Sequence, residues 1–155
     1  MEISGKVFVV TGGGNGIGRE VVLALLAKGA HVAALDLSEA GLAETAQLAN
    51  AGERLSTHVV DIVDRAAVQK LPAAVTKAHG GIDGLVNVAG IIHRFVPVSE
   101  LSFEDIERVM GVNFWGTVNT VKTFLPVLAE RPAASLVNVS SMGALVPFPG
   151  QSAYG

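Results

Sequence analysis

The sequence predicts an α/β fold, a doubly wound parallel sheet with helices on both faces. Short runs of β-branched and other apolar residues alternate with longer stretches whose apolar residues recur at helical spacing. The strand-length runs are apolar throughout, which is typical of strands that are covered on both faces. A glycine cluster stands between the first such run and the first helical stretch. This alternation predicts parallel strands joined by right-handed helical connections.

Three strands and two helices are predicted in the first half of the chain. The strands are the apolar runs at 6–10, 31–35 and 55–60. The first helix begins at Ile17, where apolar residues start to recur every three or four positions, and Gly29 ends it. Ser38 starts the second helix, which we expect to run to about Asn50.

Two further strands are predicted in the second half, at 82–87 and 135–139. Asp64 is the expected N-cap of a helix that precedes the first of these strands. Pro72 lies inside that helical stretch and lacks a backbone N–H, so we expect a kink or a division into two short helices.

The region between these last two strands is expected to form two helices with a break between them. The segment 102–105, Ser-Phe-Glu-Asp, is a capping box for a first helix through Val112. Apolar residues at i, i+4 and i+7 predict a second helix from Phe114 to Leu128. Asn113 therefore falls between the two helices.

Length and composition favour one globular domain, residues 1–155, and exclude several classes of protein. Half of the residues are hydrophobic and 16% are charged, which excludes a disordered chain. The net charge of −3 gives no reason to expect nucleic acid. No apolar run approaches the roughly 18 residues of a membrane span, and the N-terminus has no basic region of a secretory signal. We therefore expect a cytoplasmic protein with no membrane or nucleic-acid partner.

No metal site is expected. The chain has no cysteine, which excludes disulfides and thiolate ligands. The four histidines, at 31, 58, 79 and 93, are scattered in the sequence without the spacing of metal ligands.

The glycine cluster directly after the first strand is a candidate phosphate-binding loop. Gly12, Gly16 and Gly18 stand where a strand turns into a helix, and a helix N-terminus attracts anions. Because position 17 is Ile, the loop does not match the common G-x-G-x-x-G pattern. A tight strand-to-helix connection without a ligand is the alternative interpretation.

Asp36 at the end of the second strand is a candidate ribose-binding residue. Its carboxylate can accept hydrogen bonds from both hydroxyls of an adenosine ribose, and it would repel a 2′-phosphate. Neither Asn15 nor Leu37 offers the cation that a 2′-phosphate needs. NAD is therefore preferred over NADP. The alternative is that Asp36 caps the next helix together with Ser38.

Motifs in a fixed order then resemble the short-chain dehydrogenase/reductase family, over the chain from Lys6 to Tyr154. The segment 11–18, T-G-G-G-N-G-I-G, resembles the T-G-x3-G-x-G signature of the non-extended branch. The segment 87–90 resembles the family's N-N-A-G turn, with Val88 in place of the second Asn.

The later motifs resemble the family's catalytic residues. The segment 137–141, V-N-V-S-S, resembles the strand end that carries the catalytic Ser. Tyr154 follows Ser141 by 13 residues, the family's usual interval, which selects Ser141 over its neighbour. Asn113 falls at the position of the family's catalytic Asn.

The resemblance implies a Rossmann-type dinucleotide-binding fold and oxidoreduction of an alcohol or carbonyl with a nicotinamide cofactor. Asp61 and Ile62 would flank the adenine, and the 87–90 turn would support the central sheet and the adenosine ribose. The implied cofactor-binding residues are Gly12, Asn15, Gly16, Ile17, Gly18, Asp36, Asp61, Ile62, Asn87, Ala89 and Gly90.

The resemblance also implies a role for each catalytic residue. Tyr154 would be the general acid/base, Ser141 would donate a hydrogen bond to the substrate oxygen, and Asn113 would hold a water. A phenol has an ordinary pKa of about 10 and is therefore a poor base at neutral pH. Positive charge near the Tyr would lower this pKa by favouring the phenolate. The alternatives are that Tyr154 is a surface aromatic, that Ser141 caps a turn and that Asn113 marks a helix break.

Two segments are informative about the substrate, 91–95 and 142–148, which follow the last two strands. Ligands of open α/β sheets bind at those strand ends. Because the second segment is apolar, we expect an apolar secondary alcohol or ketone. His93 and Arg94 could instead select a carboxylate.

The family places a Lys four residues after its Tyr, at a position 158 that follows Gly155. One hypothesis is that the sequence is the N-terminal part of an NAD-dependent dehydrogenase. The other is a truncated, non-catalytic NAD-binding module. In both, the sheet is truncated after its fifth strand, and the 155-residue piece itself is expected to show little or no turnover. The uncovered sheet edge and the Phe114–Leu128 helix favour a homo-oligomer.

Overall fold

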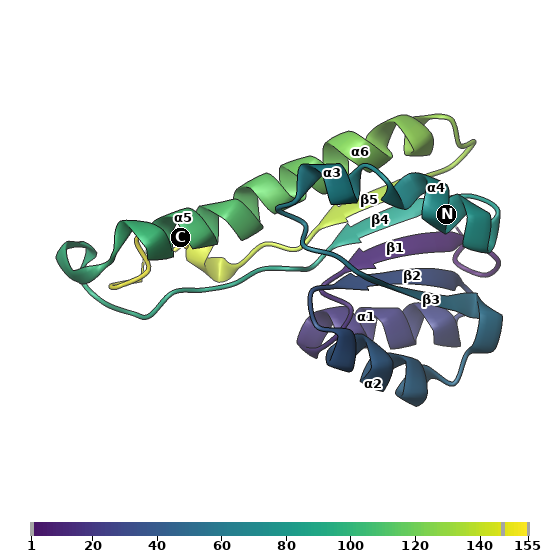
Figure 1. Cartoon of the computed structure of the whole chain (residues 1–155), viewed down its shortest axis with the longest axis horizontal. Coiled ribbons are helices and arrows are strands. Elements are labelled where there is room, and N and C mark those ends of the chain that lie inside the picture. The colour runs from purple at the N-terminus through teal and green to yellow at the C-terminus, as the bar shows by residue number, and fades with distance from the viewer. Residues whose placement is uncertain (1, 147, 155) are drawn as a thin grey trace.

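The computed structural model describes residues 2–146 and 148–154, and they contain one sheet of five parallel strands. The order across the sheet is β3-β2-β1-β4-β5 (Figure 1). The strands are β1 (Val7–Thr11), β2 (His31–Asp36), β3 (Leu55–Val59), β4 (Gly84–Asn87) and β5 (Ser135–Asn138). The predicted parallel sheet is confirmed, and β4 begins two residues later than the sequence suggested.

Helices cover both faces of the sheet, which confirms the doubly wound architecture (Figure 1). One face carries α1 and α2, and the other carries α3, α4 and α6. The α-helices are α1 (Gly16–Ala27), α2 (Glu39–Ala49), α3 (Arg65–Val68), α4 (Leu71–His79), α5 (Phe103–Met110) and α6 (Thr117–Ala129). Short 3₁₀ turns occupy Gly52–Arg54, Val98–Glu100 and Met142–Ala144.

The strand order changes direction beside β1. The chain adds β2 and β3 on one side of β1 and then β4 and β5 on the other. In open α/β sheets the crevice at such a point, outside the carboxyl ends of the strands, is where ligands bind. The topology therefore places the candidate site between the carboxyl ends of β1 and β4.

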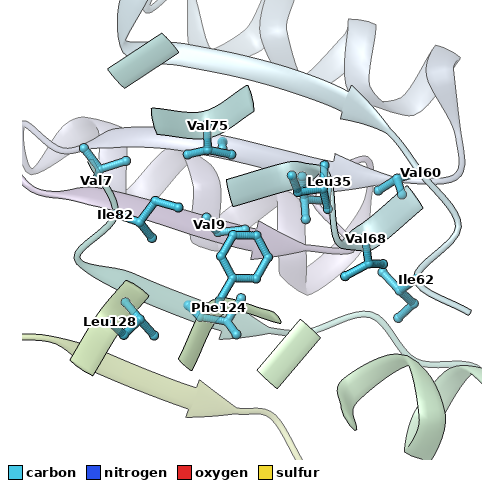
Figure 2. Packing of buried hydrophobic residues seen from close by; sticks show 13 residues of the cluster. Val7, Val9, Leu35, Val60, Ile62, Val68, Val75, Ile82, Phe124 and Leu128 are labelled. Atoms are coloured by element: carbon cyan, nitrogen blue, oxygen red, sulfur yellow. The ribbon is translucent and has the colours of Figure 1, made fainter. Parts of the chain in front are cut away.

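Two apolar clusters hold the helices to the sheet. On one face, Val22 and Leu26 of α1 and Leu42 of α2 pack against the strands. On the other face, the fully buried ring of Phe124 extends from α6 into the middle of the cluster (Figure 2). Val9 of β1 belongs to that second cluster. Because alternate residues of one strand point to opposite faces, a continuous apolar strand serves both clusters.

A buried carboxylate fixes the amino end of the sheet. The N–H of Val7 donates to Asp83 Oδ2 at 3.0 Å, and Arg131 Nε donates to Asp83 Oδ1 at 2.8 Å. Burial of Asp83 raises its pKa, but these two hydrogen bonds, with the charges of Arg131 and Lys6, outweigh burial and hold the pKa below its ordinary value. The ionised Asp83, directly before β4, therefore ties β1 to Arg131 in the turn after α6.

The predicted helix ends are largely confirmed in the middle of the chain. Asp64 is the N-cap of α3, and its side chain accepts a hydrogen bond from the N–H of Ala67 at 3.0 Å. Pro72 lies in the first turn of α4, so the stretch is divided into two short helices. Ser102 caps α5 through the N–H of Asp105.

The predicted break at Asn113 is wrong. The helical path continues from α5 through a π-helical segment, Gly111–Gly116, into α6. Figure 1 shows these elements as one long helix that extends beyond the sheet. A π turn inserts one residue without interrupting the backbone hydrogen bonding, so the change of apolar phase that suggests two helices arises within one. Pro126 lies inside α6.

Three of the histidines that are scattered in the sequence, His31, His58 and His79, lie close together in the structure. His79 Nε2 and His58 Nε2 lie 2.8 Å and 3.0 Å from the same Ser56 Oγ, and the rings of His31 and His79 meet edge to face at 5.6 Å. Burial lowers the pKa of His58, and burial with the charges of His31 and His58 lowers that of His79.

Within residues 2–146 and 148–154, no group of three or more His, Asp or Glu side chains has the geometry to hold a metal ion. In the same part of the chain, no helix combines the length and the apolar character that crossing a membrane requires.

We expect the folded chain to lose stability as the pH falls below about 6.5, the ordinary pKa of histidine. Folding lowers the pKa values of His58 and His79, so the unfolded chain binds more protons than the folded chain in this pH window. The free energy of unfolding therefore decreases as the pH decreases. Urea unfolding at about pH 8 and about pH 5.5 measures the slope. His79→Gln should flatten it, whereas Lys77→Gln, which removes an exposed charge from the same helix, should not. An equal slope in wild type and His79→Gln would contradict this prediction.

Candidate functional site

A cleft of about 740 Å³ opens at the carboxyl ends of β1 and β4, where the topology predicted a ligand site. Its size suits a small-molecule or cofactor site. Every residue that the sequence nominated for the cofactor or for catalysis lines it, except Gly16, which is the first residue of α1. Residues separated by more than a hundred positions, such as Gly12 and Tyr154, therefore face one cavity.

The glycine loop turns sharply between β1 and α1. Gly12 and Gly16 have left-handed backbone angles, φ +70° and +48°, which favour glycine. A Cβ atom on Gly18 would overlap the carbonyl of Gly12, so the first turn of α1 lies directly against the end of β1. The loop is thus a tight strand-to-helix connection, the feature that the alternative interpretation of the glycines predicted. It also presents the unpaired N–H groups of a helix start to the cleft.

Asp36 lies at the end of β2 beside this loop. Its Oδ2 accepts a hydrogen bond from the N–H of Gly14 at 2.8 Å and its Oδ1 accepts one from Ser38 at 2.9 Å. The N-cap of α2 is Ser38, whose side chain accepts from Gly41. Asp36 is therefore not the helix cap, and each of its oxygens keeps a lone pair for a further donor.

The loop after β3 is held by residues that sequence reasoning missed. Asn119 is buried in α6, and its Nδ2 donates to the carbonyls of Ile62 at 3.0 Å and Val63 at 3.3 Å. The Ile62 side chain lies over Gly116, where a Cβ atom would come within 2.5 Å of Ile62 Cδ1. The long helix therefore fixes the position of Ile62 at the cleft, next to Asp61.

A chain of buried polar groups supports the turn after β4. Thr11 Oγ1 accepts hydrogen bonds from the N–H groups of Val88 at 3.0 Å and Ala89 at 3.1 Å. Asn87 accepts from Thr120 Oγ1 at 2.8 Å and donates to Asn138 Oδ1 at 2.9 Å. Through Asn87, the turn is joined to α6 and to the end of β5.

Asn113 lies in the π-helical segment and pairs with the backbone after that turn. Its Oδ1 accepts from the N–H of Ile91 at 2.8 Å, and its Nδ2 donates to the carbonyl of Ile91 at 2.9 Å. This reciprocal pair holds the segment that follows β4 against the long helix. π-helical segments are frequent at functional sites because they displace one residue from the regular register.

Ser141 and Tyr154 line the same cleft. Ser141 Oγ accepts a hydrogen bond from the N–H of Gly143 at 3.1 Å and so caps the turn after β5, as its alternative interpretation proposed. A hydroxyl that accepts one bond still has its own proton to donate. Tyr154 packs on that turn, because a Cβ atom on Gly143 would lie 3.3 Å from its ring.

His93 is buried and joins the segment after β4 to the residues before Tyr154. Its Nδ1 lies 2.6 Å from the carbonyl of Arg94, and its Nε2 accepts from the N–H of Ala153 at 3.2 Å. Both ring nitrogens are therefore engaged, and exposed Arg94 does not line the cleft. The proposed selection of a carboxylate by these two residues finds no support in this geometry.

Charge is distributed unevenly along the cleft. Among the described lining residues, Asp36 and Asp61 are the charged ones; Asp36 ends β2 and Asp61 follows β3. The lining residues that follow β4 and β5 include apolar Ile91, Ile92, Val139 and Ala144 and the hydroxyl groups of Ser140 and Ser141, and Tyr154 adds a third hydroxyl. The cleft is thus acidic at the ends of β2 and β3 and uncharged at the ends of β4 and β5. Pro147, in the second segment that informed the substrate prediction, lies outside the described residues.

Comparison with protein families matches the model of the short chain dehydrogenases to residues 6–155. SadH of Mycobacterium tuberculosis, whose name describes an oxidoreductase, is 42% identical over 151 residues, which are 97% of this chain and 54% of SadH. A 2,5-dichloro-2,5-cyclohexadiene-1,4-diol dehydrogenase of Sphingobium indicum is 37% identical over 99% of this chain and 61% of its own length. The chain thus spans little more than half the length of these relatives.

Solved structures of similar proteins share the fold. A short chain dehydrogenase/reductase from Burkholderia phymatum in complex with NAD superposes with a TM-score of 0.94 at 33% identity, over 99% of this chain and 55% of that one. ElxO with NADP bound superposes with a TM-score of 0.88 at 28% identity, over 96% of this chain and 60% of that one. The similar structures therefore include complexes with either nicotinamide dinucleotide.

Two glycines of the π-helical segment provide a matched pair of variants. Gly116→Ala should lower the free energy of unfolding by about 1–3 kcal/mol, since its methyl group would overlap Ile62. Gly111→Ala, whose Cβ would have no neighbour closer than 3.9 Å, should raise stability by about 0.5–1 kcal/mol, as alanine favours helix. Urea unfolding of both variants tests the contact. Equal effects of the two substitutions would show that Ile62 does not pack on Gly116.

Proposed function

Because the chain belongs to the short-chain dehydrogenase family, we propose that it supplies the cofactor site and the catalytic tyrosine of an NAD-dependent oxidoreductase. The reaction is hydride transfer between the nicotinamide and a secondary alcohol or ketone. One observation carries the proposal: a single cleft joins the helix start and Asp36 at one end to Ser141 and Tyr154 at the other. A dinucleotide whose ribose lies at Asp36 would extend along this cleft towards Ser141 and Tyr154.

The residues present fit a dinucleotide. The start of α1 offers N–H groups to the pyrophosphate, and the glycines let the backbone approach it. The free lone pairs of Asp36 accept the ribose hydroxyls. Asp61 and Ile62 flank the adenine from the next loop. Gly12, Asn15, Gly16, Ile17 and Gly18 with Asn87, Ala89 and Gly90 complete the proposed cofactor site.

The carboxylate of Asp36 supports NAD over NADP. A 2′-phosphate placed on the same ribose would meet the negative charge of Asp36, and exposed Leu37 offers no compensating cation. Arg19, beneath the glycine loop, lies 2.6 Å from the carboxylate of Glu44, so its charge is already paired.

The hydroxyl groups of Ser141 and Tyr154 supply the acid–base chemistry. The nicotinamide, when bound, accepts or supplies the hydride. Ser141 donates its proton to a hydrogen bond with the substrate oxygen while its own oxygen stays fixed by Gly143. Tyr154 takes the proton from an alcohol, or returns it to a carbonyl oxygen. Asn113 positions the backbone at Ile91. By the family resemblance, it would also hold a water that links the family's Lys to solvent.

The apolar lining supports an uncharged, apolar substrate. Ile91, Ile92 and Ala144 surround the substrate end, and no charged side chain among the described lining residues lies there. A cyclic or branched secondary alcohol fits such a surface. The cyclic diol named for the relative from Sphingobium indicum is a substrate of this kind.

Exposed apolar surface supports a homo-oligomer. Phe114 and Trp115 stack edge to face on the long helix with about half of each side chain exposed. Surfaces of this kind are stabilised by association with another chain.

Asp36→Ala should weaken NAD binding about tenfold or more and reduce the preference for NAD over NADP, because two charge-assisted hydrogen bonds to the ribose are lost. Isothermal titration calorimetry with each cofactor measures both affinities. Glu39→Gln, which removes an exposed carboxylate at the start of α2, is the control and should bind as wild type does. Unchanged NAD affinity in Asp36→Ala, or tighter binding of NADP than NAD by wild type, would refute the ribose assignment.

Tyr154→Phe should lower turnover about 10²–10⁴-fold with little change in NAD affinity, since it removes the proton carrier and keeps the ring. The absorbance of the reduced nicotinamide reports turnover in the complete polypeptide in which this sequence occurs. Ser141→Ala should act in the same direction. NAD binding without turnover by that wild-type polypeptide, over a panel of secondary alcohols, would favour the non-catalytic module.

A further inference from the structure

A polar cluster lies against the glycine loop. It consists of the largely buried Arg19 from α1, the fully buried Thr45 from α2 and the exposed Glu44 from α2, and its acceptors include the carbonyls of Gly13 and Gly14. The resemblance to known families does not account for Thr45, and neither Thr45 nor Arg19 lines the cleft. In this cluster a fully buried hydroxyl, that of Thr45, and a largely buried guanidinium, that of Arg19, both bond to carbonyl groups of the glycine loop.

Thr45 bonds directly to the loop. Its side chain is fully buried, and Oγ1 lies 2.8 Å from the carbonyl of Gly13 and 3.0 Å from that of Gly41 in its own helix. A threonine inside a helix commonly bonds to the carbonyl four residues earlier. Here both carbonyls lie within hydrogen-bond distance of the one hydroxyl proton, and the contact with the loop is the shorter of the two. The same oxygen accepts a hydrogen bond from Arg19 Nε at 3.0 Å.

Arg19 holds the next carbonyl of the loop. Its Nη2 donates to the carbonyl of Gly14 and to Glu44 Oε2 at 2.6 Å, and its side chain is only 16% exposed. A guanidinium presents its donors in a rigid planar fork, so one side chain can bond to the loop, to Thr45 and to Glu44 together.

The loop is tightly packed at Gly14. A Cβ atom on Gly41 would lie 2.7 Å from the carbonyl of Gly14, and one on Gly14 would lie 2.8 Å from Cγ of Asp36. The N–H of Gly14 donates to Asp36 Oδ2. Gly14 is therefore packed between α2 and the Asp36 carboxylate, and a shift of its peptide groups changes the place of that carboxylate.

We propose that Arg19 and Thr45 are positioning residues for the adenosine half of NAD. They hold the carbonyls of Gly13 and Gly14 from behind, and thereby fix the Asp36 carboxylate in the position where it receives the ribose hydroxyls. They touch neither cofactor nor substrate. The inference rests on the proposed function, because it assigns a ligand to the loop that the cluster holds.

The test compares Thr45→Val, which keeps the shape and removes the hydroxyl, with Thr45→Ser, which keeps the hydroxyl. Calorimetry gives the Kd values for NAD, NADP and AMP at a temperature where unfolding curves show each variant to be folded. Thr45→Val should raise the Kd for NAD and for AMP about tenfold and reduce the NAD-to-NADP preference, since Asp36 is no longer fixed. Thr45→Ser should remain within about twofold of wild type.

Arg19→Lys provides a second, independent variant, because lysine keeps the charge and loses the planar fork. It should weaken NAD and AMP binding in the same direction, whereas Glu20→Gln, an exposed neighbour on α1, should not. If Thr45→Val does not fold, Arg19→Lys against Glu20→Gln decides the question.

The readout separates positioning from a purely structural role. A residue that only stabilises the fold would lower the unfolding temperature and leave both the Kd values and the NAD-to-NADP ratio of the folded protein unchanged, and that result would overturn the inference. If wild type binds neither dinucleotide nor AMP, the proposed function fails and the inference fails with it. Wild-type affinity for NAD with unchanged values in Thr45→Val and Arg19→Lys overturns the inference alone.

Discussion

The close approach of four backbone segments at the glycine loop is the constraint on which the rest of the site depends. Four glycines of this connection have no room for a side chain. Gly18 meets the carbonyl of Gly12, Gly13 meets Ala34 of β2, Gly14 meets Asp36, and Gly12 meets Ala89 of the turn after β4. These contacts fix the start of α1, the acidic end of β2 and the turn after β4 relative to one another.

Much of the architecture could be predicted because local signals agreed with one another. Apolar runs predicted all five strands, and caps such as Asp64 predicted helix starts, since these signals act within a few residues along the chain. The nominated site residues come together because parallel strands bring their carboxyl ends to one edge. The choice of Ser141 and Tyr154 came from the resemblance to the family's interval between these residues, because local sequence patterns do not indicate catalytic residues. The roles assigned to these residues stay predictions.

The features that sequence reasoning missed depend on distant backbone contacts. Asn119 and His93 act on carbonyl and amide groups 57 and 60 positions away, so neither has a recognisable neighbour in the sequence. The π-helical segment was read as a break, because a single inserted residue shifts the apolar phase as a real break does. The three histidines gather only when β2, β3 and α4 are assembled.

The three histidines bind protons at a different part of the molecule from the cleft proposed to bind the dinucleotide. His31 begins β2, His79 ends α4 and His58 is the penultimate residue of β3. None of the three lines the cleft, so protons bind these histidines outside the proposed dinucleotide site. Protonation of these histidines favours the unfolded chain. Through them, acid would weaken dinucleotide binding by lowering the population of folded molecules, without competition for the cleft itself.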